Sequence, residues 1–257
     1  FIHLVKTKDD AFTNSYVVKE IFDDTLRNYL LRISAGAEDD NIIILKDIKR
    51  EIPEEKTADE IIKELDLFVG MDNIKKTVKE MINQIKWQKE RMKRGLGKAE
   101  KISLHTVITG NPGTGKTMVS RKLGEIFQSV GFLDRGHVIE TSRKDLVGEY
   151  VGSTAPKTNK KIDEAIGGIL FIDEAYTLAP DTEGSSDQFG KEAIETIMKR
   201  MEDDRGKFVV IAAGYKDEME RFLNINPGLK SRFDKYIHFN DYNADELMAI
   251  FKIMVDK

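Results

Sequence analysis

Two helical patterns of apolar residues mark the amino-terminal third of the chain. The first runs from Phe12 to Ile33, with charged residues between the apolar positions Val18, Ile21, Phe22, Tyr29 and Ile33. The second begins at Ile74 and gives way to the basic stretch 86–98; its further apolar positions are Val78, Met81, Ile82 and Ile85. Such spacings indicate one amphipathic helix each. A charged stretch around Pro53 separates the two, and because proline disfavours helix just before it, we expect a domain boundary there.

Strand-like apolar runs dominate the chain beyond residue 105. Four of them alternate with longer helical segments: Thr106–Thr109, His137–Glu140, Ile169–Ile172 and Phe208–Ala213. Strands separated by helical segments are typical of βαβ units, whose strands run parallel. The pattern therefore predicts an α/β fold in which helices flank a parallel sheet.

Composition excludes several kinds of site and partner. The 257 residues carry 41 basic and 45 acidic side chains, and a net charge of −4 gives no global attraction to nucleic acid or to an anionic membrane. With no cysteine, neither disulfides nor thiolate metal sites can form. The lack of cysteine and a charged fraction of 33% suit an intracellular protein, so we expect the cytoplasm. No stretch approaches the roughly 20 apolar residues of a membrane span. Because the chain starts at Phe1 rather than Met, we expect it to be a fragment.

A glycine-rich P-loop follows the first of these strands. The sequence from Gly110 to Thr117 reads GNPGTGKT and leads into a helical pattern, as this motif requires. Glycines let the backbone amides face phosphates, Lys116 reaches the β- and γ-phosphates, and Thr117 can ligate Mg²⁺. The motif thus predicts ATP and Mg²⁺ as cofactors, bound by Asn111, Pro112, Gly113, Thr114, Gly115, Lys116, Thr117 and Met118. The alternative is an ordinary glycine turn between a strand and a helix.

Two carboxylates end the strand that runs from Gly168 to Ile172. Asp173 and Glu174 follow it directly, although an apolar strand needs no such ending in order to fold. In a P-loop ATPase an acid here holds the Mg²⁺ shell, and the next acid can orient and deprotonate the attacking water. We therefore predict Asp173 as a metal and nucleotide residue and Glu174 as the catalytic base, assisted by Lys116. The alternative is that both acids cap the next helix.

Together these motifs resemble AAA+ ATPases of the CbxX/CfqX subfamily, which includes rubisco-activase-like proteins, the stage V sporulation protein K type and ATPases of type VII secretion. Further runs that carry the resemblance are Phe189–Glu195, Met201–Asp203, Val209–Tyr215 and Asn226–Phe233. The likeness covers about Leu65 to Asp256. It implies a five-stranded parallel sheet flanked by helices and a homo-oligomeric ring, expected to be a hexamer.

The resemblance also implies roles for single residues. In the subfamily the arginine of Ser-Arg-Phe points into the neighbouring subunit's ATP site, which makes Arg232 an arginine finger that stabilises charge on the transferred phosphoryl group. A surface arginine without that role is the alternative. Tyr215 stands where many AAA+ relatives place a sensor asparagine, and for it both a sensor role and simple packing remain open.

A pore loop is implied between the second strand and the next helix, within 146–154. Tyr150, Val151 and Gly152 form its tip, and an aromatic side chain beside glycines can grip a polypeptide while the glycines permit movement. The alternative is that Tyr150 packs at the base of the loop.

We divide the chain into four parts. Residues 1–52 form a helical, lid-like segment, which we expect to end a preceding AAA+ module; an unrelated helical domain is the alternative. Residues 53–64 are the predicted linker, 65–241 the AAA+ ATPase core, and 242–257 the start of a truncated helical lid.

The predicted function is ATP hydrolysis in a ring that threads or remodels a protein substrate. A nucleic-acid motor or loader is one alternative, since the basic stretch 86–98 contains Trp87, but Glu90 interrupts it and basic helix ends are common. We therefore do not expect nucleic acid as a partner. A nucleotide-gated assembly scaffold is the other alternative, and Glu174 argues against it because the residue needed for hydrolysis is present.

Overall fold

The computed structural model describes residues 15–36, 43, 57–95, 102–179, 187–225 and 227–255. The chain forms two compact units, Phe1–Glu55 and Lys56–Lys257. In the first unit, helix α2 (Ser15–Ser34) confirms the helix expected from the apolar pattern at 12–33. Of the apolar run expected at 42–45, only Ile43 lies among the described residues.

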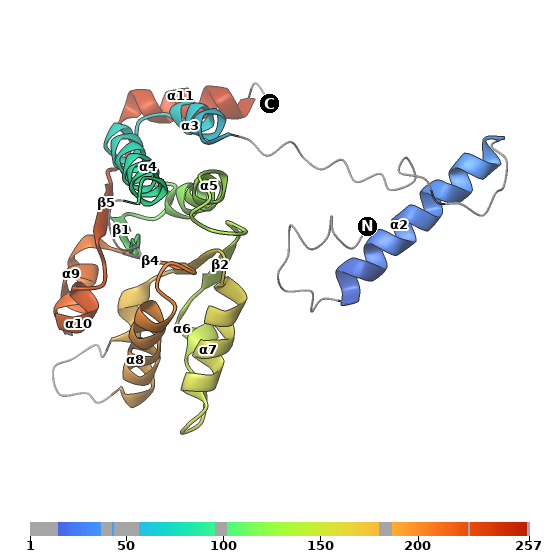
Figure 1. Cartoon of the computed structure of the whole chain (residues 1–257). Helices are drawn as coiled ribbons and strands as arrows, with labels where there is room; N and C mark the ends of the chain where they lie inside the picture. Colours follow the sequence, from blue (N-terminus) through green and yellow to red (C-terminus); the bar gives the residue numbers. More distant parts are fainter. Residues whose placement is uncertain are drawn as a thin grey trace. The chain divides into compact units, whose positions relative to one another are not determined.

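The second unit is built on a five-stranded sheet (Figure 1). Its strands are β1 (Thr106–Gly110), β2 (Val138–Thr141), β3 (Ile169–Ile172), β4 (Val209–Gly214) and β5 (Lys235–Phe239). They lie in the order β2-β3-β4-β1-β5, and every neighbouring pair is parallel. The four strand-like runs of the sequence are therefore confirmed to within one residue at each end, and the fold is the expected α/β sheet.

Helices cover both faces of the sheet (Figure 1). One face packs against α3 (Ala58–Asp66), α4 (Asp72–Lys93) and α5 (Lys116–Ser129). The other packs against α6 (Arg143–Leu146), α7 (Thr154–Ala165), the 3₁₀ helix η1 (Ala175–Leu178), α8 (Gln188–Asp203) and α9 (Lys216–Ile225). The short α10 (Pro227–Lys230) follows α9, and α11 (Ala244–Val255) follows the last strand.

The two cores follow from the period of a strand, whose successive side chains point to opposite faces. In β3, Ile169 and Phe171 enter the core beneath α4 and α5, whereas Leu170 and Ile172 enter the core beneath α7 and α8. All four side chains are buried, which explains why this strand reads as an uninterrupted apolar run.

Helix α3 falls largely within the segment 53–64 that the sequence pattern assigned to a linker. Thr57 caps it through a reciprocal capping box with Glu60, and Ile61 and Leu65 are buried in the core shared with α4 and α5. Lys122 on α5 also binds Glu64 at 2.9 Å. The second unit accordingly begins at Lys56, ahead of the core boundary expected at residue 65.

Helix α11 occupies most of the segment 242–257, for which we expected the start of a helical lid. It has no buried residue, and its apolar side chains Leu247, Met248 and Phe251 are each more than half exposed. The lid assignment stays a prediction. None of the helices in the described part of the chain is long and apolar enough to cross a membrane.

Candidate nucleotide site

Three segments that are distant in sequence meet at the carboxyl edge of the sheet. The P-loop follows β1, Asp173 and Glu174 follow β3, and Tyr215 follows β4, which lies between those two strands. They surround a cavity of about 420 Å³. Its lining includes Pro112, Gly113, Gly115, Lys116, Thr117, Met118, Asp173, Glu174 and Tyr215, with Gly110 and Gly214. The sheet topology thus brings most of the predicted nucleotide residues together.

The glycines of the P-loop hold conformations that other residues rarely adopt. Gly113 has φ +77°, and a side chain there would meet nothing within 4 Å, so the backbone of the loop stays open toward the cavity. Gly115 has φ +93° and directly precedes α5. The free N–H groups at the start of that 14-residue helix therefore point at the same space and favour an anion there.

Lys116 brings the positive charge of the cavity. Its Nζ donates hydrogen bonds of 2.8 Å to the carbonyl oxygens of Gly110 and Asn111. Burial lowers the pKa of Lys116, and the carboxylates of Asp173 and Glu174 oppose that shift. Both carboxylates therefore stabilise the charged form of the ammonium group. A phosphate that binds in the cavity would meet this cation with the two carboxylates nearby.

Glu174 has a left-handed backbone with φ 49°, which is uncommon for a residue other than glycine. Its carbonyl oxygen accepts hydrogen bonds from Thr177 N at 2.8 Å and from Thr177 Oγ1 at 2.7 Å. Although Glu174 precedes η1, its side chain makes no cap hydrogen bond to that helix. The capping alternative therefore gains no support at Glu174, whose carboxylate lines the cavity, whereas Asp173 Oδ1 accepts from the Glu174 N–H at 3.1 Å.

Tyr176 is a site residue that the sequence analysis did not single out. Its ring lies 6.0 Å from the ring of Tyr215, centroid to centroid. Burial raises the pKa of Tyr176 to about 12, and the nearby Glu174 carboxylate adds to the shift. Tyr215 thus packs on Tyr176 and also lines the cavity, so both readings of Tyr215 stay open. No local sequence signal marks Tyr176.

Asn111 and Thr114 belong to the P-loop but do not line the cavity. The Asn111 side-chain amide donates to both carboxylate oxygens of Asp241 at 2.9 Å. Thr114 Oγ1 donates to the Asn111 carbonyl at 2.8 Å, and the Tyr242 hydroxyl donates to the Thr114 carbonyl at 3.2 Å. These two P-loop side chains hold the loop in shape and attach it to the segment after β5.

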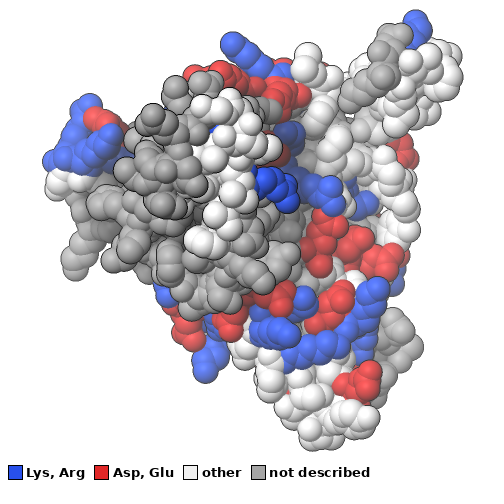
Figure 2. Space-filling model, turned by 90° about the vertical axis from the view of Figure 1, so that its right-hand side faces the viewer, with Lys and Arg blue, Asp and Glu red and all other residues white. Residues whose placement is uncertain are grey.

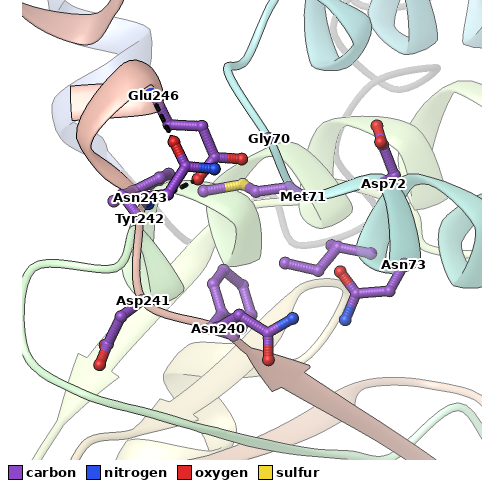
Figure 3. A pocket seen from close by; sticks show the side chains of 11 residues that line it. Gly70, Met71, Asp72, Asn73, Asn240, Asp241, Tyr242, Asn243 and Glu246 are labelled. Atoms are coloured by element: carbon purple, nitrogen blue, oxygen red, sulfur yellow. Dashed lines mark hydrogen bonds between the residues drawn. The ribbon is translucent and has the colours of Figure 1, made fainter. Parts of the chain in front are cut away.

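A second cavity of about 350 Å³ lies where the start of α4 meets the segment after β5 (Figure 3). Gly70 and Met71 lie on one side of it, and the segment 240–246 lies on the other. A side chain at Gly115 would meet Met71 Cε at 2.9 Å and the Tyr242 hydroxyl at 3.6 Å, so two residues that line this cavity also approach the P-loop. No sequence motif marks this cavity, because its two walls are far apart along the chain.

Arg232 and the expected pore loop lie outside both cavities. Arg232 precedes β5, and its guanidinium donates to the carbonyl oxygens of Met198 at 3.1 Å and Gly228 at 2.9 Å. Asn226, in the same motif, lies outside the described residues. In the loop between α6 and α7, Tyr150 is 74% exposed and Val151 is 93% exposed, so Tyr150 does not pack at the loop base.

Sequence comparison finds relatives for most of this second unit. The family described as "ATPase family associated with various cellular activities (AAA)" matches residues 106–241. Stage V sporulation protein K of Bacillus subtilis is 50% identical over 198 residues, which are 77% of this chain and 60% of that protein.

Two further relatives match to a similar extent. The chloroplastic ribulose bisphosphate carboxylase/oxygenase activase of Cyanidioschyzon merolae is 44% identical over 200 residues, 77% of this chain and 67% of the activase. The chromosomal CbxX protein of Cupriavidus necator is 42% identical over 200 residues, 77% of this chain and 62% of CbxX. The chain thus spans between 60% and 67% of the length of these three relatives.

Proposed function

The chain belongs to the AAA family of ATPases, in the subfamily of CbxX and stage V sporulation protein K, and from this membership we propose that it is a ring-forming motor that couples ATP hydrolysis to the remodelling or threading of a protein substrate. The observation that carries the proposal is one cavity lined by a lysine, a helix N-terminus and two carboxylates. A cation with backbone donors suits a polyphosphate, and the carboxylates suit Mg²⁺ and a water nucleophile.

Lys116, Thr117 and Asp173 are the residues that would hold Mg·ATP. The open backbone at Gly113 and the start of α5 offer N–H donors, and Lys116 offers a cation at the same place. A hydroxyl and a carboxylate are hard oxygen ligands of the kind Mg²⁺ takes, usually beside waters and phosphate oxygens. Bound Mg²⁺ neutralises negative charge that develops on the phosphates. Glu174, on the wall of the same cavity, is the proposed base for the attacking water.

Arg232 supports a ring because it cannot serve the cavity of its own chain. Gly110, where the P-loop begins, pairs with Phe239 at the end of β5, whereas Arg232 precedes the start of β5 at Lys235. A strand of five residues spans roughly 16 Å at about 3.3 Å per residue, so β5 separates the arginine from the P-loop edge by that length. An arginine finger at this position would act on the nucleotide of a neighbouring copy.

The loop between α6 and α7 is the proposed substrate contact. Ser153 Oγ donates to the Tyr150 carbonyl at 2.6 Å and accepts from the Tyr150 N–H at 3.1 Å, which closes a tight turn. Gly152, with φ +81°, permits that turn. The turn leaves the ring of Tyr150 and the side chain of Val151 exposed, and such apolar contact suits an extended polypeptide of any sequence.

The basic stretch on α4 is less suited to nucleic acid than its composition indicated. Lys89 Nζ donates to the carbonyls of Val130 and Gly131 at 2.6 and 2.8 Å and so holds the end of α5. Arg94 Nε lies 2.8 Å from Glu90 Oε1, and Arg91 Cζ lies 4.7 Å from the centroid of the Trp87 ring. Lys98 lies outside the described residues. On the described part of the face drawn in Figure 2, basic and acidic side chains lie next to one another.

The decisive experiment compares substrate coupling with basal turnover in the full-length protein. Tyr150→Ala should keep basal ATP turnover and ring assembly, because the ring is exposed and lies outside the nucleotide cavity, but it should lose remodelling of a polypeptide. Tyr150→Phe is the matched control and should keep remodelling, since it retains the aromatic ring. Turnover is measured with casein, a general unfolded polypeptide, and with single-stranded DNA as competing stimulants, and ring content is measured by light scattering.

Other outcomes favour the alternative functions. Stimulation by DNA but not by polypeptide, reduced by Arg91→Ala with Lys93→Ala and weakened steeply by salt, would favour a nucleic-acid motor. Basal turnover near zero in assembled protein would favour a nucleotide-gated scaffold. Full remodelling by Tyr150→Ala would end the threading proposal and leave the ATPase assignment standing.

A further inference from the structure

Arg143, at the start of α6, makes two short contacts directly behind the turn that carries Glu174. Its Nη1 donates to the Thr177 carbonyl oxygen at 2.7 Å and lies 2.6 Å from Asp187 Oδ2. The Arg143 side chain is 36% exposed and that of Asp187 is 18% exposed, so this ion pair is screened by water less than a surface pair. One guanidinium therefore joins η1, α6 and the residue that precedes α8.

Thr177 is also the residue that closes the turn at Glu174. Its N–H and its hydroxyl both donate to the Glu174 carbonyl, at 2.8 and 2.7 Å. A residue other than glycine in the left-handed region is strained and persists only where its surroundings fix it. Because Arg143 holds the Thr177 carbonyl, it fixes the far side of the peptide turn that keeps Glu174 at φ 49°.

Asp187 connects the same arginine to the start of α8. Its Oδ1 accepts from the Gly190 N–H at 3.0 Å and thereby caps the helix, while Oδ2 faces Arg143. The hydrogen bond from Arg143 is the main reason that the pKa of Asp187 is lowered. A side chain at Gly190 would clash with the Leu178 carbonyl and meet Asp187 Oδ2 at 2.6 Å and Arg143 Nη1 at 2.9 Å. The starts of α6 and α8 and the end of η1 are thus closely packed around the guanidinium.

The element that carries Arg143 is itself held firmly. Asp145 and Ser142 form a reciprocal capping box at the start of α6. At its end, Thr158 Oγ1 on α7 donates to the Leu146 carbonyl at 2.9 Å, and Lys157 Nζ donates to the Lys144 carbonyl at 2.6 Å. A catalytic group is held in place by neighbours that are themselves fixed, and α6 meets that condition.

We propose that Arg143 is a positioning residue for hydrolysis: with Asp187, it clamps the turn at Thr177 and so holds the Glu174 carboxylate in the orientation needed to activate water. The proposal rests on the proposed role of Glu174. Arg143 does not line the nucleotide cavity and contacts none of its P-loop residues. Loss of the clamp therefore changes the rate of the chemical step and leaves nucleotide binding intact.

The test measures kcat, KM and ATP affinity in the full-length protein. Because a misplacement of about 1 Å at a catalytic group costs up to ~100-fold in rate, we expect Arg143→Ala to lower kcat by about 10- to 100-fold with KM and affinity for a non-hydrolysable ATP analogue unchanged. Arg143→Lys should restore most of the rate, because an ammonium group can donate to both partners. Asp187→Asn keeps the α8 cap and loses only the ion pair, so it should lose rate in the same direction.

Controls separate positioning from folding and from failure of the Glu174 role. Arg121→Ala removes an arginine paired with Glu140 at 2.6 Å on α5 and β2, and it should leave kcat unchanged. In a double-mutant cycle, adding Asp187→Asn to Arg143→Ala should cost no further rate, because the arginine that Asp187 pairs with is already absent. Normal kcat in Arg143→Ala while Glu174→Gln is inactive would overturn the proposal. Wild-type turnover in Glu174→Gln would instead overturn the role of Glu174, and with it the reason for the clamp.

Discussion

Lys116 and Arg232 lie at opposite edges of the sheet and have different surroundings. At the carboxyl edge, Lys116 lies in a cavity with Asp173 and Glu174, whose charges act on its ammonium group. At the amino edge, the Arg232 guanidinium donates only to backbone carbonyls among the described residues, and Arg205 also acts on the neighbouring His105. Lys116 thus lies among carboxylates, whereas backbone carbonyls alone hold the Arg232 guanidinium in the described part of the chain.

This difference shows how one chain can supply the phosphate-binding part of one ATP site and the arginine of a neighbouring site. In a parallel sheet every loop that follows a strand lies at the carboxyl edge. The P-loop and the acids after β3 therefore lie close together. The loop before β5 is at the opposite edge for the same reason. Arg232 donates only to backbone carbonyls among the described residues, and a guanidinium held in this way suits an anion on another molecule. The comparison therefore predicts that changes at the two edges have separable effects.

The largest effect is expected at the carboxyl edge. Lys116→Ala should weaken ATP binding by about 100-fold or more and remove turnover with it, because hydrogen bonds to charged groups contribute about 1.5–3 kcal/mol each and the ammonium would serve two phosphates. Lys122→Ala is the matched control on the same helix, since Lys122 pairs with Glu64 and Glu125 away from the cavity. Calorimetric titration measures the affinity, and an unchanged value in Lys116→Ala would contradict the assignment of the phosphate site.

The next effect belongs to the amino edge and should spare binding. Arg232→Ala should keep ATP affinity and lose roughly 10³-fold in turnover, the lower range for an arginine finger. Arg221→Ala, an exposed arginine on α9, should leave turnover unchanged. Mixed rings decide whether the arginine acts across an interface: Arg232→Ala subunits mixed with Lys116→Ala subunits should recover activity, because some interfaces then pair an intact arginine with an intact phosphate site. No recovery in proven mixed rings would refute action between copies.

The strands show what local pattern can and cannot predict. Buried strands such as β3 can be predicted from the sequence because the side chains on both faces are apolar. The edge strand β5 alternates buried Ile237 and Phe239 with exposed Tyr236 and His238, so it carries no continuous apolar run and its residues were not assigned. Helix α3 was also missed, yet a signal was present: Thr57 followed three residues later by Glu60 is a capping-box pattern.

The site likewise contains residues that a sequence motif marks and contacts that no local pattern predicts. The P-loop and the acids after β3 could be located because spacing and flanking elements mark them. The pairing of Asn111 with Asp241, and of Arg143 with Asp187, joins segments whose distance depends on the packed fold. Polar partners of that kind have no period along the chain. The left-handed conformation of Glu174 is likewise set by its neighbours and not by its residue type.

His105 provides the remaining contrast between the edges. It is buried just before β1, and its Nδ1 accepts from the Val210 N–H at 2.9 Å. Burial lowers the pKa of His105 to about 4; a backbone hydrogen bond at Met201 opposes the shift, and Arg205 and Arg232 add to it. The carboxyl edge thus holds a charged lysine beside acids, while the amino edge holds a neutral histidine beside arginines.

The smallest effect is therefore a change of stability with pH at the amino edge. Since the unfolded pKa of histidine is about 6.5, the unfolded chain binds the proton first as pH falls below that value, and folding stability should decline down to about pH 4. Between pH 7 and pH 5 this histidine should contribute about 2 kcal/mol of the loss. His105→Asn keeps an acceptor for Val210 and cannot titrate, so urea unfolding should show a loss smaller by that amount. Equal losses in the two proteins would mean that His105 is not held neutral by the fold.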